Sequence, residues 1–362
     1  MQNSVFTGAR KAQKNSRGNE AMVNKKWLVW LMVAVLVMAS LAGCAPKAEP
    51  AAPAEPAPGA ETPAEEAPKI VLILPGPIND QGWNATAYEG LKLVEKDLGV
   101  TMEYVESVQQ ADFESTFRDY GEKGYDLVFA HGTQFFDAAK AIGPQYPDTF
   151  FMVINSEEGV EPNVGGIGIR EWEGGYVAGT LAAMNTTSKQ MGAIGSFPFP
   201  VIEGTLDAFE AAAIAVDPAI KVTKTYVNSW DDIQKGKETA LAMIEAGSDL
   251  VFCSANQVGL GSIDAAKTKG VKAIGYISPQ NEVAPGTVIS SITYNTPGLF
   301  KVAVQDFLDG KLTATGKSLG WADGVLDVQW TDGVTDEMKA TIETTIQDLK
   351  DGKIENPYVP GD

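Results

Sequence analysis

The sequence predicts an α/β protein made of two lobes, each a doubly wound parallel sheet. Short apolar runs typical of buried strands alternate with helical segments from Lys69 onward. Strictly alternating strands and helices favour parallel sheets with helices on both faces. The alternation comes in two series, the second beginning at Met191, which predicts two lobes.

The first series starts with residues 69–74, KIVLIL, an apolar run with the length of a buried strand. Further strands are expected at 102–105, 126–130, 149–154 and 164–169. Helices are expected at 84–97, 111–122, 135–145 and 171–184.

The second series starts with the run at 191–194, MGAI. Its further strands are expected at 221–227, 249–253, 271–274 and 287–293. Helices are expected at 202–215, 232–246, 258–269 and 297–309, and a final one at 335–351.

The N-terminus carries the features of a bacterial lipoprotein signal. Lys25 and Lys26 precede a short apolar run that ends in the tetrapeptide LAGC at Cys44. These features predict a secretory signal with a lipobox over residues 1–44, and a mature protein whose Cys44 carries a diacylglycerol at the extracytoplasmic face of the cell membrane. An uncleaved anchor is the alternative, but the run is short for a span of about 20 residues. Residues 45–68, rich in Ala, Pro and Glu, are expected to form a disordered linker.

The charge balance narrows the class of partner. Without residues 1–44 the chain keeps 22 basic and 46 acidic residues, a net charge of −24. A nucleic-acid partner needs Lys and Arg facing its phosphates, so this balance argues against one. It also argues against electrostatic adhesion to anionic lipid.

Cysteine and histidine usage gives little support for catalysis. With Cys44 assigned to lipid, only Cys253 remains, so no internal disulfide is expected. Cys253 and the single histidine, His131, both end apolar runs and are interpreted as buried structural residues. The sequence has no phosphate loop, nucleophile elbow or metal-ligand spacing, so neither an enzyme nor a cofactor is predicted.

The loops that follow the strands are the candidate site, because ligands of such sheets bind beyond the carboxyl ends of the strands. These loops are rich in Trp, Phe, Asn, Gln, Ser and Asp, and contain no Arg or Lys. An anionic ligand would need Arg, or a helix-end nest with Lys. Aromatic faces with amide and carboxylate groups instead suit a flat, neutral molecule such as a nucleobase, and less closely a caged cation.

Ten loop residues are candidate ligand contacts. The aromatic candidates are Trp83, Phe135, Phe197, Phe199 and Trp230. The polar candidates are Asp80, Asn84, Gln134, Asn256 and Gln280. Structural alternatives stay open: Asp80 could cap the following helix, and Trp83 and Trp230 could pack on the lobe surface.

Four segments carry a resemblance to a known family. They are 79–84 (NDQGWN), 173–179 (EGGYVAG), 194–202 (IGSFPFPVI) and 228–238 (NSWDDIQKGKE). Together they resemble the BMP (basic membrane protein) family of ABC-transporter substrate-binding lipoproteins, whose best-known branch binds purine nucleosides. The resemblance runs from about Lys69 to Asn356.

The resemblance implies the type I periplasmic-binding fold, with hinge strands crossing between the lobes. The expected parts are lobe 1 at 69–188, lobe 2 at 189–290, a return to lobe 1 at 291–320, and a C-terminal crossing and helix at 321–362. By the same likeness, Trp83 and Trp230 match base-stacking aromatics on opposite lobes. Asp80 and Asn84 match polar contacts to the base.

Two departures from the nucleoside-binding branch bear on the ligand. Residues 276–280, YISPQ, stand where that branch has an Asp for the ribose hydroxyls, and Thr293 stands in place of its Lys. The tryptophan in the first segment and the GSFP stretch look more like a branch that binds free bases such as adenine. A purine base is therefore favoured over a nucleoside.

The sequence thus predicts a lipid-anchored, monomeric binding protein of an ABC importer. Its lobes would close on a purine-like ligand, and a membrane permease would be its partner. One rival is an extracytoplasmic nucleoside-acting enzyme, in which Asp80 with Glu157 or Asp231 would be the conceivable acid/base pair. The other rival is a ligand-sensing lipoprotein that signals to a receptor.

Overall fold

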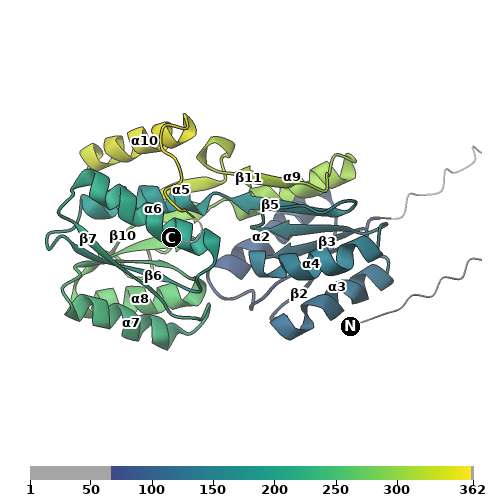
Figure 1. Cartoon of the computed structure of the whole chain (residues 1–362), viewed down its shortest axis with the longest axis horizontal. Helices are drawn as coiled ribbons and strands as arrows, with labels where there is room; N and C mark the ends of the chain where they lie inside the picture. The colour runs from purple at the N-terminus through teal and green to yellow at the C-terminus, as the bar shows by residue number, and fades with distance from the viewer. Residues whose placement is uncertain (1–66, 360–362) are drawn as a thin grey trace, which may run out of the picture. The chain divides into compact units, whose positions relative to one another are not determined.

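Two six-stranded sheets form the two lobes of the computed structural model, which describes residues 67–359 (Figure 1). The predicted signal, Cys44 and almost all of the predicted linker lie outside the described residues. Within 67–359 no helix has both the length and the apolar character needed to cross a membrane.

The first sheet has the order β11-β5-β4-β3-β1-β2, and all its neighbouring strands are parallel. Its strands are β1 (Ile70–Ile73), β2 (Met102–Val105), β3 (Leu127–His131), β4 (Phe150–Ile154), β5 (Val164–Ile169) and β11 (Gly316–Leu319). Two helix pairs pack on it: α2 (Trp83–Leu98) with α9 (Thr296–Leu308), and α3 (Phe113–Glu122) with α4 (Phe136–Ile142).

Both faces of the first sheet are buried at its central strands, which is why β1, β3 and β4 are continuous apolar runs. Successive residues of β1 enter two different cores: Leu72 joins the core that contains Phe300 of α9, and Val71 joins the core that contains Phe117 of α3. Such two-sided burial is what helices on both faces of a parallel sheet produce.

The second sheet repeats the design with the order β12-β10-β9-β8-β6-β7. Its strands are β6 (Gln190–Gly195), β7 (Lys221–Tyr226), β8 (Leu250–Ser254), β9 (Lys272–Ile277), β10 (Val288–Tyr294) and β12 (Leu326–Trp330). All neighbours are parallel except β12, which runs antiparallel to β10. Its helices are α5 (Glu171–Ala183), α6 (Pro200–Val216), α7 (Ile233–Glu245), α8 (Asn256–Lys269) and α10 (Asp336–Lys350).

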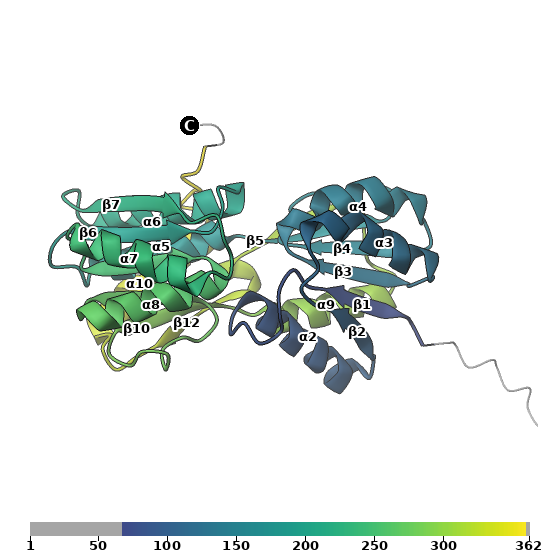
Figure 2. The same ribbon diagram turned by 90° about the horizontal axis from the view of Figure 1, so that it is seen from below.

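The chain crosses between the lobes three times, after β5, after β10 and after β11 (Figure 2). Backbone hydrogen bonds join the crossings: Arg170 N–H donates to the Leu319 carbonyl at 2.7 Å, and Asn295 N–H to the Val325 carbonyl at 2.9 Å. Arg170 also pairs with Glu173 at 2.7 Å, and Glu173 accepts from the Trp321 N–H at 2.8 Å. Glu173, the first residue of EGGYVAG, therefore links the crossing after β5 to the crossing after β11.

The α/β fold with two doubly wound lobes and hinge strands is confirmed, but the lobe boundaries fall elsewhere than expected. Helix α5 packs on α6 and α10 of the second lobe, so that lobe begins near Arg170 and not at 189. All of β10 belongs to the second sheet, so the return to lobe 1 comes at Asn295 and not at 291. Sequence patterns predict strands and helices but not the lobe to which each belongs, because the chain passes from one lobe to the other within a single connection between a strand and the next helix.

Strands β11 and β12 are absent from the sequence-based expectations. Each lies at the edge of its sheet, and each is short. The GKSL of β11 has a single large apolar residue, and the LDVQW of β12 alternates polar and apolar residues. Edge strands with one solvated face lack the apolar runs that mark the central strands.

Close helix packing in the second lobe depends on glycine at Gly261 of α8. A Cβ there would overlap the Ile233 carbonyl oxygen of α7, whereas at Gly259 on the same helix the nearest heavy atom is 3.9 Å away. Gly261→Ala should therefore lower the free energy of unfolding by about 1–3 kcal/mol through overpacking. Gly259→Ala should be neutral or stabilising by up to about 1 kcal/mol. Urea denaturation measures both, and equal effects would contradict the close packing.

Candidate functional site

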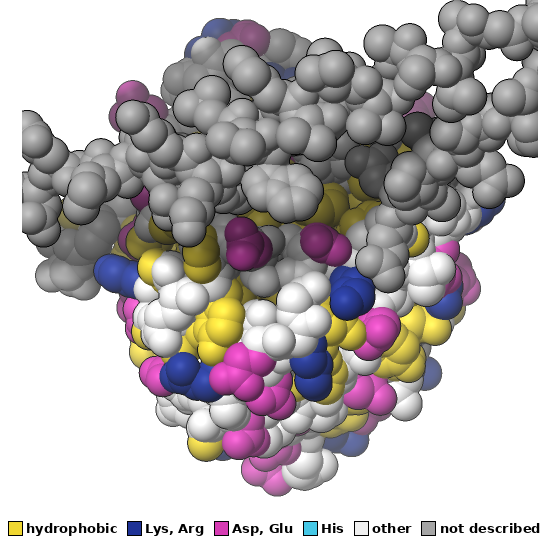
Figure 3. Space-filling model, turned by 90° about the vertical axis from the view of Figure 1, so that its right-hand side faces the viewer, with side chains coloured by type: hydrophobic (Ala, Val, Ile, Leu, Met, Phe, Trp, Pro, Cys, Tyr) yellow, Lys and Arg dark blue, Asp and Glu magenta, His cyan; other side chains and the backbone are white. Residues whose placement is uncertain are grey.

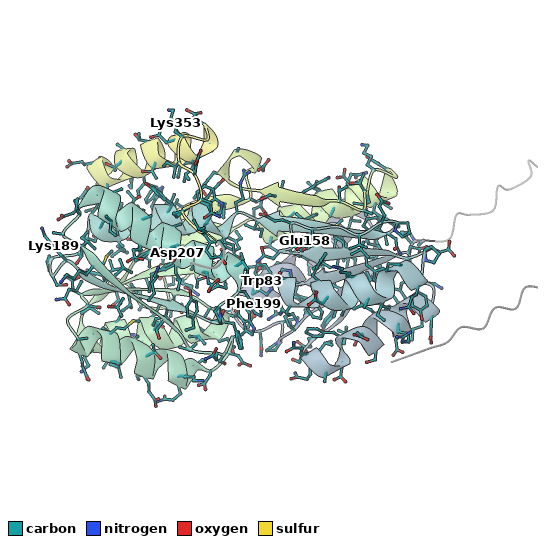
Figure 4. The ribbon with its side chains drawn as sticks, viewed as in Figure 1. Trp83, Glu158, Lys189, Phe199, Asp207 and Lys353 are labelled. Carbon is teal, nitrogen blue, oxygen red and sulfur yellow. The ribbon has the colours of Figure 1, made fainter. Side chains whose placement is uncertain are left out.

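A cavity of about 310 Å³ lies between the lobes and is lined by strand-end loops of both sheets. Its size falls within the range of small-molecule sites, and its position is where doubly wound sheets bind ligands. Figure 4 labels Trp83 and Phe199 close to this junction of the lobes. Six of the ten predicted contacts line the cavity: Trp83, Asn84, Gln134, Phe197, Trp230 and Asn256.

Trp83, the first residue of α2, offers one indole face at most to a ligand. The other face stacks on His131, with ring centroids 3.9 Å apart and planes 14° from parallel. The indole N–H donates to the His131 carbonyl at 3.1 Å, and His131 Nε2 donates to the Trp83 carbonyl at 2.9 Å. This reciprocal pair fixes the plane of the half-buried indole at the cavity wall.

Trp230 belongs to an aromatic group on the second lobe. Its ring lies 5.4 Å from Phe197 and 6.1 Å from Phe199, and it is nearly parallel to Phe199. Trp230 and Phe197 line the cavity, and Phe199 lines a neighbouring one of about 370 Å³. The structure thus presents indoles from opposite lobes to the same space.

Asp80 does not line either cavity, and both oxygens of its carboxylate accept hydrogen bonds from neighbouring groups of the protein. Oδ1 accepts from the N–H groups of Gly82 and Ala85, both at 2.9 Å. Oδ2 accepts from the Asn84 backbone at 2.9 Å, and from the Asn84 and Asn256 side-chain amides at 2.7 Å each. Asp80 therefore has the contacts expected of a helix cap, because its carboxylate accepts hydrogen bonds from N–H groups at the start of α2.

Contacts from Asn256 and Ser278 join the two lobes beside the cavity. Asn256 of the second lobe donates to Asp80 and accepts from the Trp83 N–H at 3.1 Å. Ser278 Oγ donates to the Gln81 carbonyl at 2.7 Å. The side-chain amides of Asn84 and Asn256 thus both donate hydrogen bonds to the Asp80 carboxylate.

Phe135 and Gln280, two predicted contacts, lie away from both cavities. Phe135 is fully buried in the core beneath α3, where its ring centroid is 4.0 Å from that of Phe113. Its loop tightens into a short 3₁₀ turn that directs the ring into the lobe. Gln280 is 6% exposed and accepts from the Tyr276 N–H at 3.1 Å, so it closes its own loop.

Sequence reasoning missed several cavity residues, among them Asn155, Glu171, Ser254 and Ile277. Ser254 Oγ is buried and has no hydrogen-bond partner among residues 67–359. Ile277 has φ = 74°, which is rare for a β-branched residue. Strained backbone of this kind is frequent at ligand sites, but an isoleucine at a strand end gives no sequence signal for it.

The cavity has an acidic and aromatic lining. Among the described residues that line it, the ionisable ones are the acidic Glu171 and Asp231, and none is Lys, Arg or His. His131 behind Trp83 is fully buried, which lowers its pKa to about 3, so it adds no positive charge at neutral pH. On the part of the first lobe coloured in Figure 3, acidic and basic side chains are interspersed.

The acid/base pair conceived for an enzyme is not brought together. The Asp80 carboxylate already accepts hydrogen bonds from backbone N–H groups and side-chain amides. Asp231 lines the main cavity, whereas Glu157 lines the neighbouring one. These carboxyls therefore do not converge on one reacting atom.

Comparisons with known proteins show which family and which fold this chain resembles. A family model described as "Bmp: ABC transporter substrate-binding protein PnrA-like" matches residues 67–356. A purine-binding protein of Brucella abortus is 27% identical over 303 residues, covering 83% of this chain and 85% of the relative. The transcriptional activator protein med of Bacillus subtilis is 26% identical, covering 67% and 76%.

Among solved structures, a solute-binding protein of an ABC transporter system from Aeropyrum pernix superposes with a TM-score of 0.72 at 21% identity. The match covers 82% of this chain and 94% of that protein. At this identity the likeness supports the fold alone.

Proposed function

Because the chain belongs to the Bmp family of PnrA-like ABC transporter substrate-binding proteins, we propose that it binds an uncharged planar heterocycle between its two lobes. A purine base is the favoured ligand and a purine nucleoside the alternative. The family is one of ABC transporter substrate-binding proteins, which bind a substrate without transforming it, and this also speaks against the nucleoside-acting enzyme.

The lining of the interlobe cavity carries the proposal. Trp83 and Trp230 come from opposite lobes, and the lining residues include no cation. Stacking on aromatic faces supplies affinity for a flat ring, and neutral polar groups orient it. An anionic ligand would meet Glu171 and Asp231 without any compensating positive charge.

The preference for a purine base over a nucleoside rests on the residues at the positions of the ribose contacts in the nucleoside branch. Residues 276–280 and Thr293 stand where the nucleoside branch has its ribose-binding groups, and of these described residues only the apolar Ile277 lines the cavity. Tyr276 instead donates to the Glu171 carbonyl at 2.9 Å. The purine-binding name of the Brucella relative supports the purine class and leaves the base or nucleoside choice open.

The cellular setting is part of the same proposal. Substrate-binding proteins of ABC importers work outside the cytoplasm, and the signal expected at residues 1–44 would attach this one to the membrane through Cys44. A membrane permease would receive the closed form from the monomeric protein. The relative named as a transcriptional activator keeps the sensing role as a second candidate, to be separated by testing transport.

Identification of the bound molecule tests the proposed function. The purified protein should release a purine on denaturation, detected by mass spectrometry. In a thermal-shift screen of bases, nucleosides, sugars and choline-like cations, a purine should raise the melting temperature most, since a ligand of the native state stabilises it. Release of a sugar or an organic anion, with no shift from any purine, would overturn the proposal.

A further inference from the structure

Glu171 occupies an unusual position for a carboxyl group. It is the first residue of α5, directly after the crossing from β5, and its side chain is 4% exposed. It lines both the main cavity and the neighbouring one, so it stands where the two meet. A ligand in the main cavity would meet this carboxyl.

No cation balances Glu171 among the described residues. Its Oε1 accepts from the Asn155 side-chain amide at 2.6 Å. The adjacent Arg170 is committed elsewhere, to Glu173 at 2.7 Å and to Asp323 at 3.2 Å. A buried carboxylate with no positive partner is costly, and such a group protonates instead.

The other titratable groups around Glu171 add no positive charge. Tyr276 of β9 donates a hydrogen bond to the Glu171 backbone carbonyl, and the Tyr294 hydroxyl of β10 lowers the pKa of the Glu171 carboxyl. Glu157 and Glu158 line the neighbouring cavity, and Asp231 lines the main one. Burial raises the pKa of Glu171 to about 7, although the Asn155 amide and the Tyr294 hydroxyl oppose this.

We propose that Glu171 meets the ligand as a neutral carboxylic acid, so that the site selects a heterocycle whose edge offers a hydrogen-bond donor beside an acceptor. A protonated carboxyl presents an O–H donor and a C=O acceptor in one plane. The amidine edge of a 6-aminopurine, an amino N–H beside a ring nitrogen, complements this pair. An edge with two adjacent donors would instead need the carboxylate. This inference rests on the proposed purine site and deepens it.

Proton linkage makes the inference measurable with adenine as the probe. The free protein loses the Glu171 proton as pH rises through about 7, so above that pH adenine binding must be accompanied by proton uptake. Adenine affinity should therefore fall by about tenfold or more between about pH 6 and about pH 8.5. Calorimetry at about pH 8 in two buffers with different ionisation enthalpies should record uptake of about one proton.

Glu171→Gln separates this role from a structural one. A glutamine amide also presents a donor and an acceptor, so E171Q should bind adenine within about threefold of the wild-type affinity at pH 6, without pH dependence or proton uptake. Glu171→Leu removes both groups and should lose at least about tenfold in affinity at pH 6. Asp231→Asn, which changes the other carboxylate of the cavity, should leave the pH dependence in place.

The outcomes separate this inference from the proposed function. If adenine binds with affinity that is independent of pH or rises with pH, or if E171Q loses binding as E171L does, the neutral-acid role of Glu171 is overturned while the purine site stands. If no purine binds at any pH, both the purine site and the inference fail.

Discussion

Replacing Trp83 with alanine should weaken binding of a purine base by about 1–3 kcal/mol, by analogy with the loss of base–aromatic stacking at single-stranded nucleic-acid sites. The His131 ring fixes the plane of the indole from behind, so the cavity loses a prepositioned stacking surface. Isothermal titration of the folded variant with adenine measures the change. An unaltered affinity would assign Trp83 to packing.

Two controls isolate the stacking contribution of Trp83. Trp83→Phe keeps an aromatic face and should retain most of the affinity. Trp330→Ala removes a half-buried indole of β12 that lines neither cavity, and should leave adenine binding unchanged. If Trp330→Ala weakened binding as much as Trp83→Ala, the loss would reflect general destabilisation.

Asp80→Ala should lower the free energy of unfolding by about 2–4 kcal/mol, since hydrogen bonds to a charged group and a helix cap are both lost. The change leaves three backbone N–H groups without their acceptor, together with the amides of Asn84 and Asn256. Urea denaturation of the protein without ligand measures the effect.

The matched control for Asp80 is Asp112→Ala. Asp112 also precedes a helix, α3, but its exposed side chain makes no capping hydrogen bond. Its replacement should change the free energy of unfolding by less than about 0.5 kcal/mol. Equal effects at the two positions would contradict the role given to the Asp80 carboxylate.

The central strands and most helices could be predicted from the sequence because buried elements have a recognisable local pattern of apolar residues. The IVLI of β1 and the LVFAH of β3 are buried on both faces, so every residue of each run is buried. Assignment of α5 to a lobe could not be predicted, because it depends on packing against α6 and α10, which follow later in the chain.

Three of the aromatic residues predicted as ligand contacts line the main cavity, and their contact with a ligand stays a prediction. Trp83, Phe197 and Trp230 all line the cavity, but Phe135 does not, because the tight turn after β3 directs its ring inward. For Asp80 the cap and the ligand contact could not be separated by sequence, since both use the same carboxylate.

Glu171 was missed for a related physical reason. An acidic residue in the first turn of a helix is common, because it interacts favourably with the helix dipole and is usually solvated. Its burial here depends on Asn155 and on tyrosines of β9 and β10, which lie more than a hundred residues further along the chain. Only the assembled lobes place this carboxyl at the cavity.

A crystal structure of the protein with adenine tests the central claim most directly. We predict the purine ring in the interlobe cavity, stacked on the free face of Trp83 with Trp230 on its other side, and no Lys or Arg in contact with it. A ring bound outside this cavity, or an organic anion occupying it in preference to adenine, would contradict the account.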